Sequence, residues 1–398
     1  MTLPTGPLIL AKATPDERTS TWVRHQPHWG SSFTPQAYVS REERLLSLGL
    51  TRDGGLTIWA LTQDTNNSID TDSTNDVNNA KNAKNASGRP ILSSLEVYRK
   101  RAIVRGTNGI VRDVTAHGVA TVFTPPKNRR KGYGSKMLSL LGDELAQQQS
   151  QEPGSAEFSI LFSDVGKTFY AQQQWMPFPS THLSFSVTPF TTTNNATEDD
   201  CLTLITNENL PMIAELDEQT VREKLARPPL RPNTVRVAIL PDLATYEWYL
   251  TRAGILTTHL LGKAPTVHGA MYNPPGRPHS RVWMLWSPAV SGGSHSPDKN
   301  VMNILHYALE DPAIPDDVLS RALNTIMCVA QTQAKEWLCS RIDMWNPEDR
   351  IRVLLQQSVS LPSELVDRET SCIASLRWFG EGSVSDVEWV DNQKFEWC

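Results

Sequence analysis

The stretch VFTPPKNRRKGYGSKML, residues 122–138, decides how the chain builds its functional centre. It begins as an apolar strand, passes through a short basic turn with two glycines, and continues directly into a helix. Gly132 and Gly134 allow the backbone to come close to a ligand and to turn its N–H groups inward. The first turn of the helix adds unpaired N–H donors and the positive end of the helix dipole. This arrangement predicts a binding site for a pyrophosphate group.

Basic side chains crowd the same turn and would neutralise a polyphosphate; they belong to Lys127, Arg129, Arg130 and Lys131. A solvated glycine turn and a nuclear-localisation run have a similar composition, so both alternatives stay open here. The GxGxxG pattern of dinucleotide-binding folds fits poorly, because Met137 stands where the third glycine belongs. The GxxxxGK(S/T) pattern of phosphate-binding loops is absent as well.

The run Arg129-x-x-Gly132-x-Gly134 after a strand resembles the Q/R-x-x-G-x-G/A acetyl-CoA signature of the GNAT acetyltransferases. FYAQQQW at 169–175 resembles a second motif of that family, Tyr-x-x-x-Gly-Phe/Trp, with Gln174 in place of the glycine. SDVGKTFYAQQQW, LEVYRKRA and the terminal EWC look like the fungal lysine N6-acetyltransferase group within it. The GNAT resemblance covers about residues 1–190, and the narrower one extends loosely over the remainder.

The resemblance implies that acetyl-CoA is the co-substrate. We expect no metal site, because His268, His279, His295 and His306 lack the spacing of metal ligands. The turn 129–134 would hold the pyrophosphate through backbone N–H groups, and strand 122–124 would pair with the pantetheine arm like an added strand. One N–H of that strand would polarise the thioester carbonyl, and the neighbouring strand 158–164 would diverge to open the slot. The expected cofactor-binding residues are Val122, Phe123, Thr124, Arg129, Arg130, Lys131, Gly132, Tyr133, Gly134 and Ser135.

Tyr170 is the predicted proton donor, since the resemblance places a tyrosine here near the CoA sulfur. A phenol with an ordinary pKa of about 10 stays protonated at neutral pH and can protonate a departing thiolate. Glu96 is the first candidate for the base that accepts the proton of the amine, and His117 and Asp164 are weaker ones. Tyr170 could also be a core residue, and Glu96 a surface carboxylate or the partner of Arg99 or Arg101. We expect direct attack in a ternary complex.

The chain has 398 residues, which predicts two or three domains. We expect an α/β protein with a mixed α+β sheet: a GNAT fold in residues 1–195 and a second GNAT-like or α+β domain in residues 196–398. The second domain would be degenerate and would shape the substrate pocket. Residues 64–89 are almost wholly polar and predict a disordered insertion between two strands of one sheet.

Hydrophobic periodicity and turn residues place the expected elements. We expect strands at 7–13, 55–61, 91–104, 117–124, 158–164, 183–190, 281–288 and 340–346, with 183–190 closing the first half. The expected helices include 132–149, a short one within 165–175, and 207–225, 242–253, 301–310 and 315–339 in the second half.

The composition argues against several classes of binding partner and cellular location. The 38 basic and 43 acidic side chains give a net charge of −5, which argues against non-specific binding to nucleic acid or to an anionic membrane. No apolar run approaches the roughly 20 residues of a membrane helix, and the N-terminus lacks the basic region of a secretory signal. We read the five cysteines as reduced thiols of a cytoplasmic protein; they are Cys201, Cys328, Cys339, Cys372 and Cys398.

We therefore predict an N-acetyltransferase for a small primary amine, with the L-lysine side chain as the most specific expectation. Another small amine, a biosynthetic intermediate, a protein lysine or a catalytically silent acyl-CoA-binding role are the alternatives. The basic stretch 225–236 is either a solvated loop or a receiver for a substrate carboxylate. The aromatic tail, with Trp389, Phe395 and Trp397, is expected to dock on the protein. The sequence predicts no oligomeric state.

Overall fold

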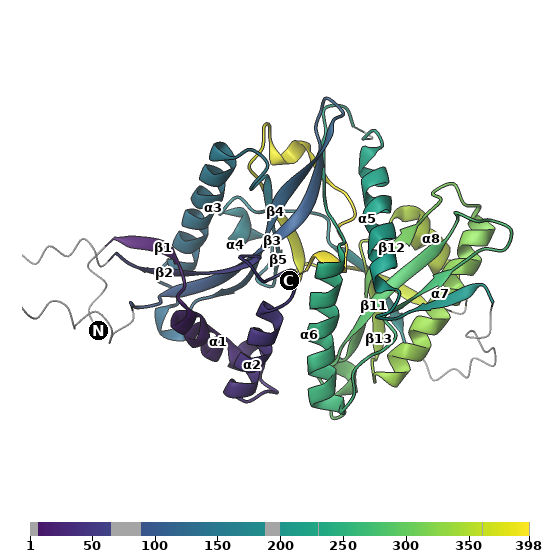
Figure 1. The fold of residues 1–398 in the computed structure, drawn as a ribbon, viewed down its shortest axis with the longest axis horizontal. Coiled ribbons are helices and arrows are strands. Elements are labelled where there is room, and N and C mark those ends of the chain that lie inside the picture. Colours follow the sequence, from purple (N-terminus) through teal and green to yellow (C-terminus); the bar gives the residue numbers. More distant parts are fainter. Residues whose placement is uncertain (1–6, 65–88, 188–199, 230, 360, 398) are drawn as a thin grey trace, which may run out of the picture.

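The computed structural model describes residues 7–64, 89–187, 200–229, 231–359 and 361–397. Two mixed β-sheets form the two sides of the molecule in Figure 1, and the helices α5 (Leu210–Ala226) and α6 (Leu243–Leu261) lie between them. The predicted insertion at 64–89 and the predicted division near residue 195 fall almost entirely outside the described ranges. Among the helices in these ranges, none has both the length and the apolar character that crossing a bilayer requires.

The first sheet has nine strands, and its main path runs in the order β1-β2-β3-β4-β5-β15-β6. The long strand β3 also pairs with β9 beyond the end of β2, and β9 in turn pairs with β16. The strands are β1 (Leu8–Lys12), β2 (Leu56–Gln63), β3 (Ser93–Arg105), β4 (Val111–Phe123), β5 (Phe158–Ser163), β6 (Met176–Pro177), β9 (Val235–Ile239), β15 (Ile373–Trp378) and β16 (Val387–Trp389).

The second sheet has seven strands in the order β14-β7-β13-β12-β11-β10-β8. Its strands are β7 (Thr181–Ser186), β8 (Leu202–Ile205), β10 (Gly269–Tyr272), β11 (Val282–Ala289), β12 (Val301–Leu309), β13 (Arg341–Trp345) and β14 (Ser363–Asp367). The remaining helices are α1 (Pro15–Trp29), α2 (Pro35–Leu46), α3 (Tyr133–Gln151), α4 (Thr168–Ala171), α7 (Asp316–Glu336) and α8 (Asp349–Gln356).

Both sheets contain the same unit, in which a helix joins two neighbouring parallel strands. In the first sheet α3 joins β4 to β5, and in the second sheet α7 joins β12 to β13. The connection into α7 is EDPAIP and contains no glycine, whereas the connection into α3 contains Gly132. The second unit therefore repeats the strand, helix and strand arrangement of the first without its glycine turn.

The expected helix at 301–310 is wrong, because these residues form strand β12. β12 lies between β11 and β13, and residues 302–308 are all buried. A strand that is covered on both faces reads as a continuous apolar run, which periodicity alone does not separate from a buried helix.

The two sheets exchange strands along the sequence. The expected strand at 183–190 is present as β7, but it pairs with β13 and β14 of the second sheet and does not close the first. In the other direction, β9, β15 and β16 from the second half of the chain join the first sheet. The first sheet is therefore complete only when the C-terminal half is folded.

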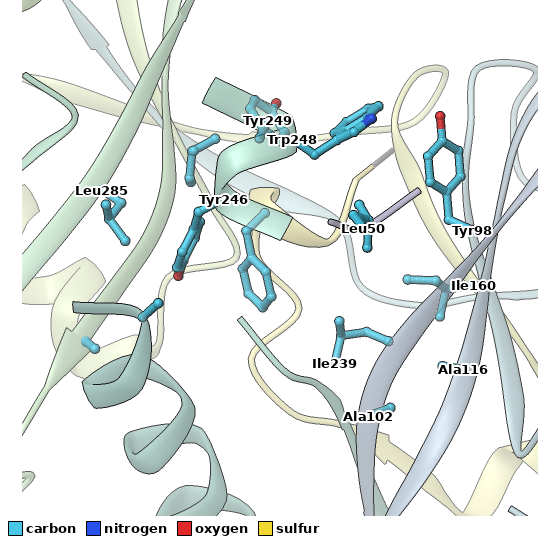
Figure 2. Packing of buried hydrophobic residues seen from close by; sticks show 14 of the residues in the cluster. Leu50, Tyr98, Ala102, Ala116, Ile160, Ile239, Tyr246, Trp248, Tyr249 and Leu285 are labelled. Carbon is cyan, nitrogen blue, oxygen red and sulfur yellow. The ribbon is translucent and has the colours of Figure 1, made fainter. Parts of the chain in front are cut away.

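One hydrophobic core spans the two sheets. It includes Ala102 and Ala116 from the first sheet, Leu285 from the second, and Tyr246 and Trp248 from α6. Figure 2 shows Trp248 facing Tyr98 of β3, and their rings meet edge to face with centroids 5.4 Å apart. Helix α6 thus couples the two sheets and brings residues of the C-terminal half beside strands β3 and β4.

Candidate active site

Strands β4 and β5 separate at one end, as the resemblance implies. Their parallel pairing runs from Ala116–Phe158 to Val119–Leu161 and stops there, although β4 continues to Phe123. At the point of separation Thr121 has a φ of 51° and lies within an irregularity of the β3–β4 register, where β4 has one residue more than β3. A bulge of this kind bends a strand away from its partner. The separation leaves an unpaired edge of β4 on which an extended chain can add.

The turn after β4 presents its backbone N–H groups. Arg130 and Gly132 both have left-handed φ values, 61° and 76°. Within this described turn, none of the N–H groups of residues 130–135 donates to another backbone or side-chain atom of the described chain. Consecutive N–H groups around left-handed residues at a helix N-terminus form a concave anion site. The backbone therefore fits a pyrophosphate as expected.

Two cavities meet beside the separated strands. A groove of about 530 Å³ follows β4 and includes Phe123, Thr124, Arg129 and Gly134 in its wall. A second cavity of about 210 Å³ lies next to it. The residues that line both are Trp29, Val122, Val165 and Tyr170.

Tyr170 lies at this junction and is half-buried on the short helix α4. Burial, with a smaller contribution from the charge of Asp164, raises the pKa of Tyr170 to about 12. The phenol is therefore protonated at neutral pH and can act as a proton donor. Gln174, which follows α4 in the place of the motif glycine, has a φ of 71°. This conformation favours glycine and explains why a glycine suits this place.

Glu96 lies in the wall of the smaller cavity and is almost fully buried. Its carboxylate accepts hydrogen bonds from Trp22 Nε1 at 3.2 Å and from Thr121 Oγ1 at 2.8 Å. Burial is the largest cause, and the charge of Glu42 the next, of a pKa raised to about 7. A carboxylate with this pKa can accept a proton near neutral pH and release it again.

A family profile described as the LYC1 GNAT-like C-terminal domain matches residues 182–398. The chain belongs to this family. It is also 21% identical to a protein named lysine acetyltransferase from Yarrowia lipolytica, over 306 residues that cover 68% of this chain and 70% of that protein.

Two solved structures share the fold of this GNAT-like chain. One is a conserved protein of Enterococcus faecalis described as a probable N-acyltransferase, with a TM-score of 0.52, 10% identity, and coverage of 94% of this chain and 72% of that one. The other is a GCN5-related N-acetyltransferase from Kribbella flavida, with a TM-score of 0.50, 13% identity, and coverage of 94% and 71%. The predicted GNAT fold and acyltransferase class are confirmed.

The predicted cofactor-binding residues of this GNAT-like protein lie in different places around the groove. Val122, Phe123, Thr124, Arg129 and Gly134 line the groove. The side chains of Arg130 and Lys131 are exposed beside it, while that of Tyr133 packs in the core beneath α3. Ser135 lies in the first turn of α3 next to the free N–H groups.

Two of the three base candidates line the smaller cavity, and the third does not. Glu96 and Asp164 both line the smaller cavity, and Asp164 Oδ1 accepts the N–H of Cys372 at 2.9 Å. His117 is buried and lines neither cavity. Burial lowers the pKa of His117 to about 4, so it carries no charge at neutral pH.

Sequence reasoning misses several residues of the smaller cavity, because they come from elements far away along the chain. They are Tyr38, Arg41 and Glu42 from α2, Trp248 and Arg252 from α6, and Trp397 from the tail. The expected docking of the tail is confirmed, since Phe395 is fully buried and Trp397 reaches this cavity. The aromatic tail is the only sequence signal for this wall. Arg252 carries no local signal at all.

Proposed function

We propose that this protein transfers the acetyl group of acetyl-CoA to a small primary amine, and that the amine is the side chain of L-lysine. The observation that carries the proposal is the junction at Tyr170. The groove along β4, which has the glycine turn 129–134 at one end, and the smaller cavity share Tyr170 in their walls. Acetyl-CoA in the groove and an amine in the smaller cavity, hereafter the acceptor cavity, can therefore reach the same point from two sides. Direct transfer requires this meeting of two substrates, because it holds the reacting atoms in place.

The residues around the junction supply the proton transfers that the reaction needs. Glu96, directly or through a water molecule, takes a proton from the ammonium group of the acceptor so that the amine can attack. A backbone N–H of residues 122–124 stabilises the negative charge that develops on the carbonyl oxygen. Tyr170 gives a proton to the departing thiolate of CoA. As the amide bond forms and the thioester bond breaks, the nitrogen loses its second proton, which replaces through solvent the proton that Tyr170 gives. No covalent enzyme intermediate is needed.

The size and walls of the acceptor cavity support a small amine over a peptide. Its volume of about 210 Å³ is below the roughly 300–1,000 Å³ of pockets for drug-sized ligands. Helix α2, helix α6 and the tail all contribute to its wall. Lysine is favoured among small amines by the name of the Yarrowia lipolytica relative.

The test is release of free CoA thiol from acetyl-CoA across a panel of L-lysine, related diamines, other amino acids and a lysine-containing peptide. We expect preferential turnover of free lysine. Preferential turnover of the peptide would replace this proposal with a protein acetyltransferase. Acetyl-CoA binding without turnover of any amine would contradict an enzymatic role for the junction.

A further inference from the structure

One of the charged side chains in the wall of the acceptor cavity has no oppositely charged partner among the described residues. The two guanidinium groups in its wall belong to Arg41 and Arg252. Arg41 is engaged, because its Nε donates to Glu42 at 2.9 Å and its guanidinium lies 4.3 Å from the ring centre of Tyr38. Arg252, by contrast, has no carboxylate within ion-pair distance in the part of the chain that the structure describes.

Aromatic rings hold Arg252 in place without using its donors. Its guanidinium lies 4.9 Å from the ring centre of Trp397 and 6.0 Å from that of Trp248. Stacking against an indole fixes the plane of a guanidinium and leaves the N–H groups along its edge available. A planar fork of free N–H donors matches the two oxygens of a carboxylate.

A second cation strengthens the positive potential at this end. Lys394 lies 4.3 Å from the ring centre of the same Trp397, and the described residues place no carboxylate within ion-pair distance of its ammonium either. The carboxylates Glu96 and Asp164 belong to other elements of the same cavity wall. An acceptor that satisfies this cavity has a cationic amine for the carboxylates and an anionic group for Arg252.

We propose that Arg252 binds the α-carboxylate of the acceptor and thereby selects amino acids over simple diamines. This inference rests on the proposed function, and it adds the chemical class of the acceptor and the residue that reads it. The side-chain amine reacts at the junction with Tyr170, and the distal end of the acceptor is held from α6. Arg252 is therefore a specificity-determining residue supplied by the C-terminal half of the chain.

The experiment compares L-lysine with cadaverine, which lacks only the carboxylate, in the full-length protein. We expect the wild-type KM for cadaverine to exceed that for lysine by roughly 10- to 100-fold. Arg252→Gln should raise the KM for lysine by a similar factor while leaving kcat and the KM for cadaverine nearly unchanged, since it removes binding that is equal in the ground and transition states. Arg252→Lys should restore lysine binding in part, because it keeps the charge without the fork.

The control is Arg44→Gln, which removes an exposed arginine of α2 that lines a neighbouring groove and not the acceptor cavity. It should change neither KM. Turnover of cadaverine by Arg252→Gln shows that the variant is folded. Equal wild-type KM values for the two amines, or an equal loss of both in Arg252→Gln, would overturn the carboxylate assignment alone. Wild-type protein that acetylates neither amine would overturn the proposed function and this assignment with it.

Discussion

The hydroxyl of Thr121 donates a hydrogen bond of 2.8 Å to Oε2 of Glu96. The bond connects two features of the site, because Thr121 marks the bulge where β4 leaves β5 and Glu96 is the proposed base. A hydrogen bond to the charged form of a carboxyl group lowers its pKa. Here it opposes the larger effect of burial and helps to keep the pKa of Glu96 at about 7.

Removing this hydrogen bond should move the pH dependence of the reaction. In the wild type, kcat/KM should rise with pH through about 7, because Glu96 must be deprotonated to accept a proton. Thr121→Ala should shift that rise upward by roughly one pH unit. Thr121→Ser keeps the hydroxyl and should retain the wild-type profile. A profile that is unchanged in Thr121→Ala would show that Glu96 is not the titrating base.

The roles of Tyr170 in catalysis and in binding can be separated. Tyr170→Phe removes the proton donor and keeps the ring, so kcat should fall about 100-fold while the Kd for acetyl-CoA stays close to the wild-type value. Tyr249→Phe, a buried tyrosine of α6 that lines neither cavity, is the matched control and should keep full activity. Steady-state kinetics and calorimetric titration measure both quantities. An intact kcat in Tyr170→Phe would remove the proton-donor assignment.

A negative charge in the turn 129–134 should strongly weaken the binding of acetyl-CoA. Gly132→Glu places a carboxylate in the turn and should weaken acetyl-CoA binding by roughly 100-fold or more. Gly54→Glu is a matched control, because Gly54 also has a positive φ, 81°, and open space where a Cβ atom would lie. Both variants should lose about 1–2 kcal/mol of stability to backbone strain, but only Gly132→Glu should lose binding. Similar acetyl-CoA affinities in the two variants would contradict the assignment of the turn.

How much of this site can be predicted from the sequence depends on distance along the chain. The strand, glycine turn and helix at 122–138 are local and predictable, as is the motif around Tyr170. The sequence of strand β12 favours a helix instead, because burial on both faces erases the period-two signal. Arg252 escapes prediction, because only the packing of α6 across β3 brings it to the cavity. Local chemistry is predictable, and the acceptor wall, which is built by tertiary contacts, is not.

The glutamine in the motif glycine position should cost stability and not activity. Gln174 has a φ of 71°, a conformation that is strained for a residue with a Cβ atom. Gln174→Gly should therefore raise the free energy of unfolding by about 0.5–1 kcal/mol, once the extra entropy of glycine in the unfolded chain is subtracted. Gln174→Ala should show no gain. Urea denaturation checks this expectation, and a glycine variant no more stable than wild type would contradict it.

A buried ion network between the sheets should make stability depend on pH. His306 lies 3.1 Å from Asp217 and 3.0 Å from Asp391 and is fully buried. Burial alone would lower the pKa of His306, but the two carboxylates raise it to about 9. The protonated imidazole therefore contributes its full stability below about pH 6.5, the ordinary pKa in the unfolded chain, and loses it as pH rises through about 9.

His306→Gln should lower the free energy of unfolding by roughly 3–5 kcal/mol near neutral pH, because it leaves the buried carboxylate of Asp217 without its cation, while Asp391 keeps its ion pair with Lys224. It should also flatten the fall in Tm between pH 6.5 and 9. His295→Gln, at an exposed position, should follow the wild-type curve. A wild-type Tm that is constant across this interval would contradict a charged His306.

The identity of the product tests most directly whether this protein acetylates the side chain of L-lysine. Purified protein would be incubated with acetyl-CoA carrying ¹³C in the acetyl group and with free L-lysine, and the products would be followed by NMR and mass spectrometry. We expect N6-acetyl-L-lysine, formed in equal amount to the released CoA and lost in Tyr170→Phe. Acetylation at the α-amine, or no acetyl-lysine at all despite bound acetyl-CoA, would contradict it.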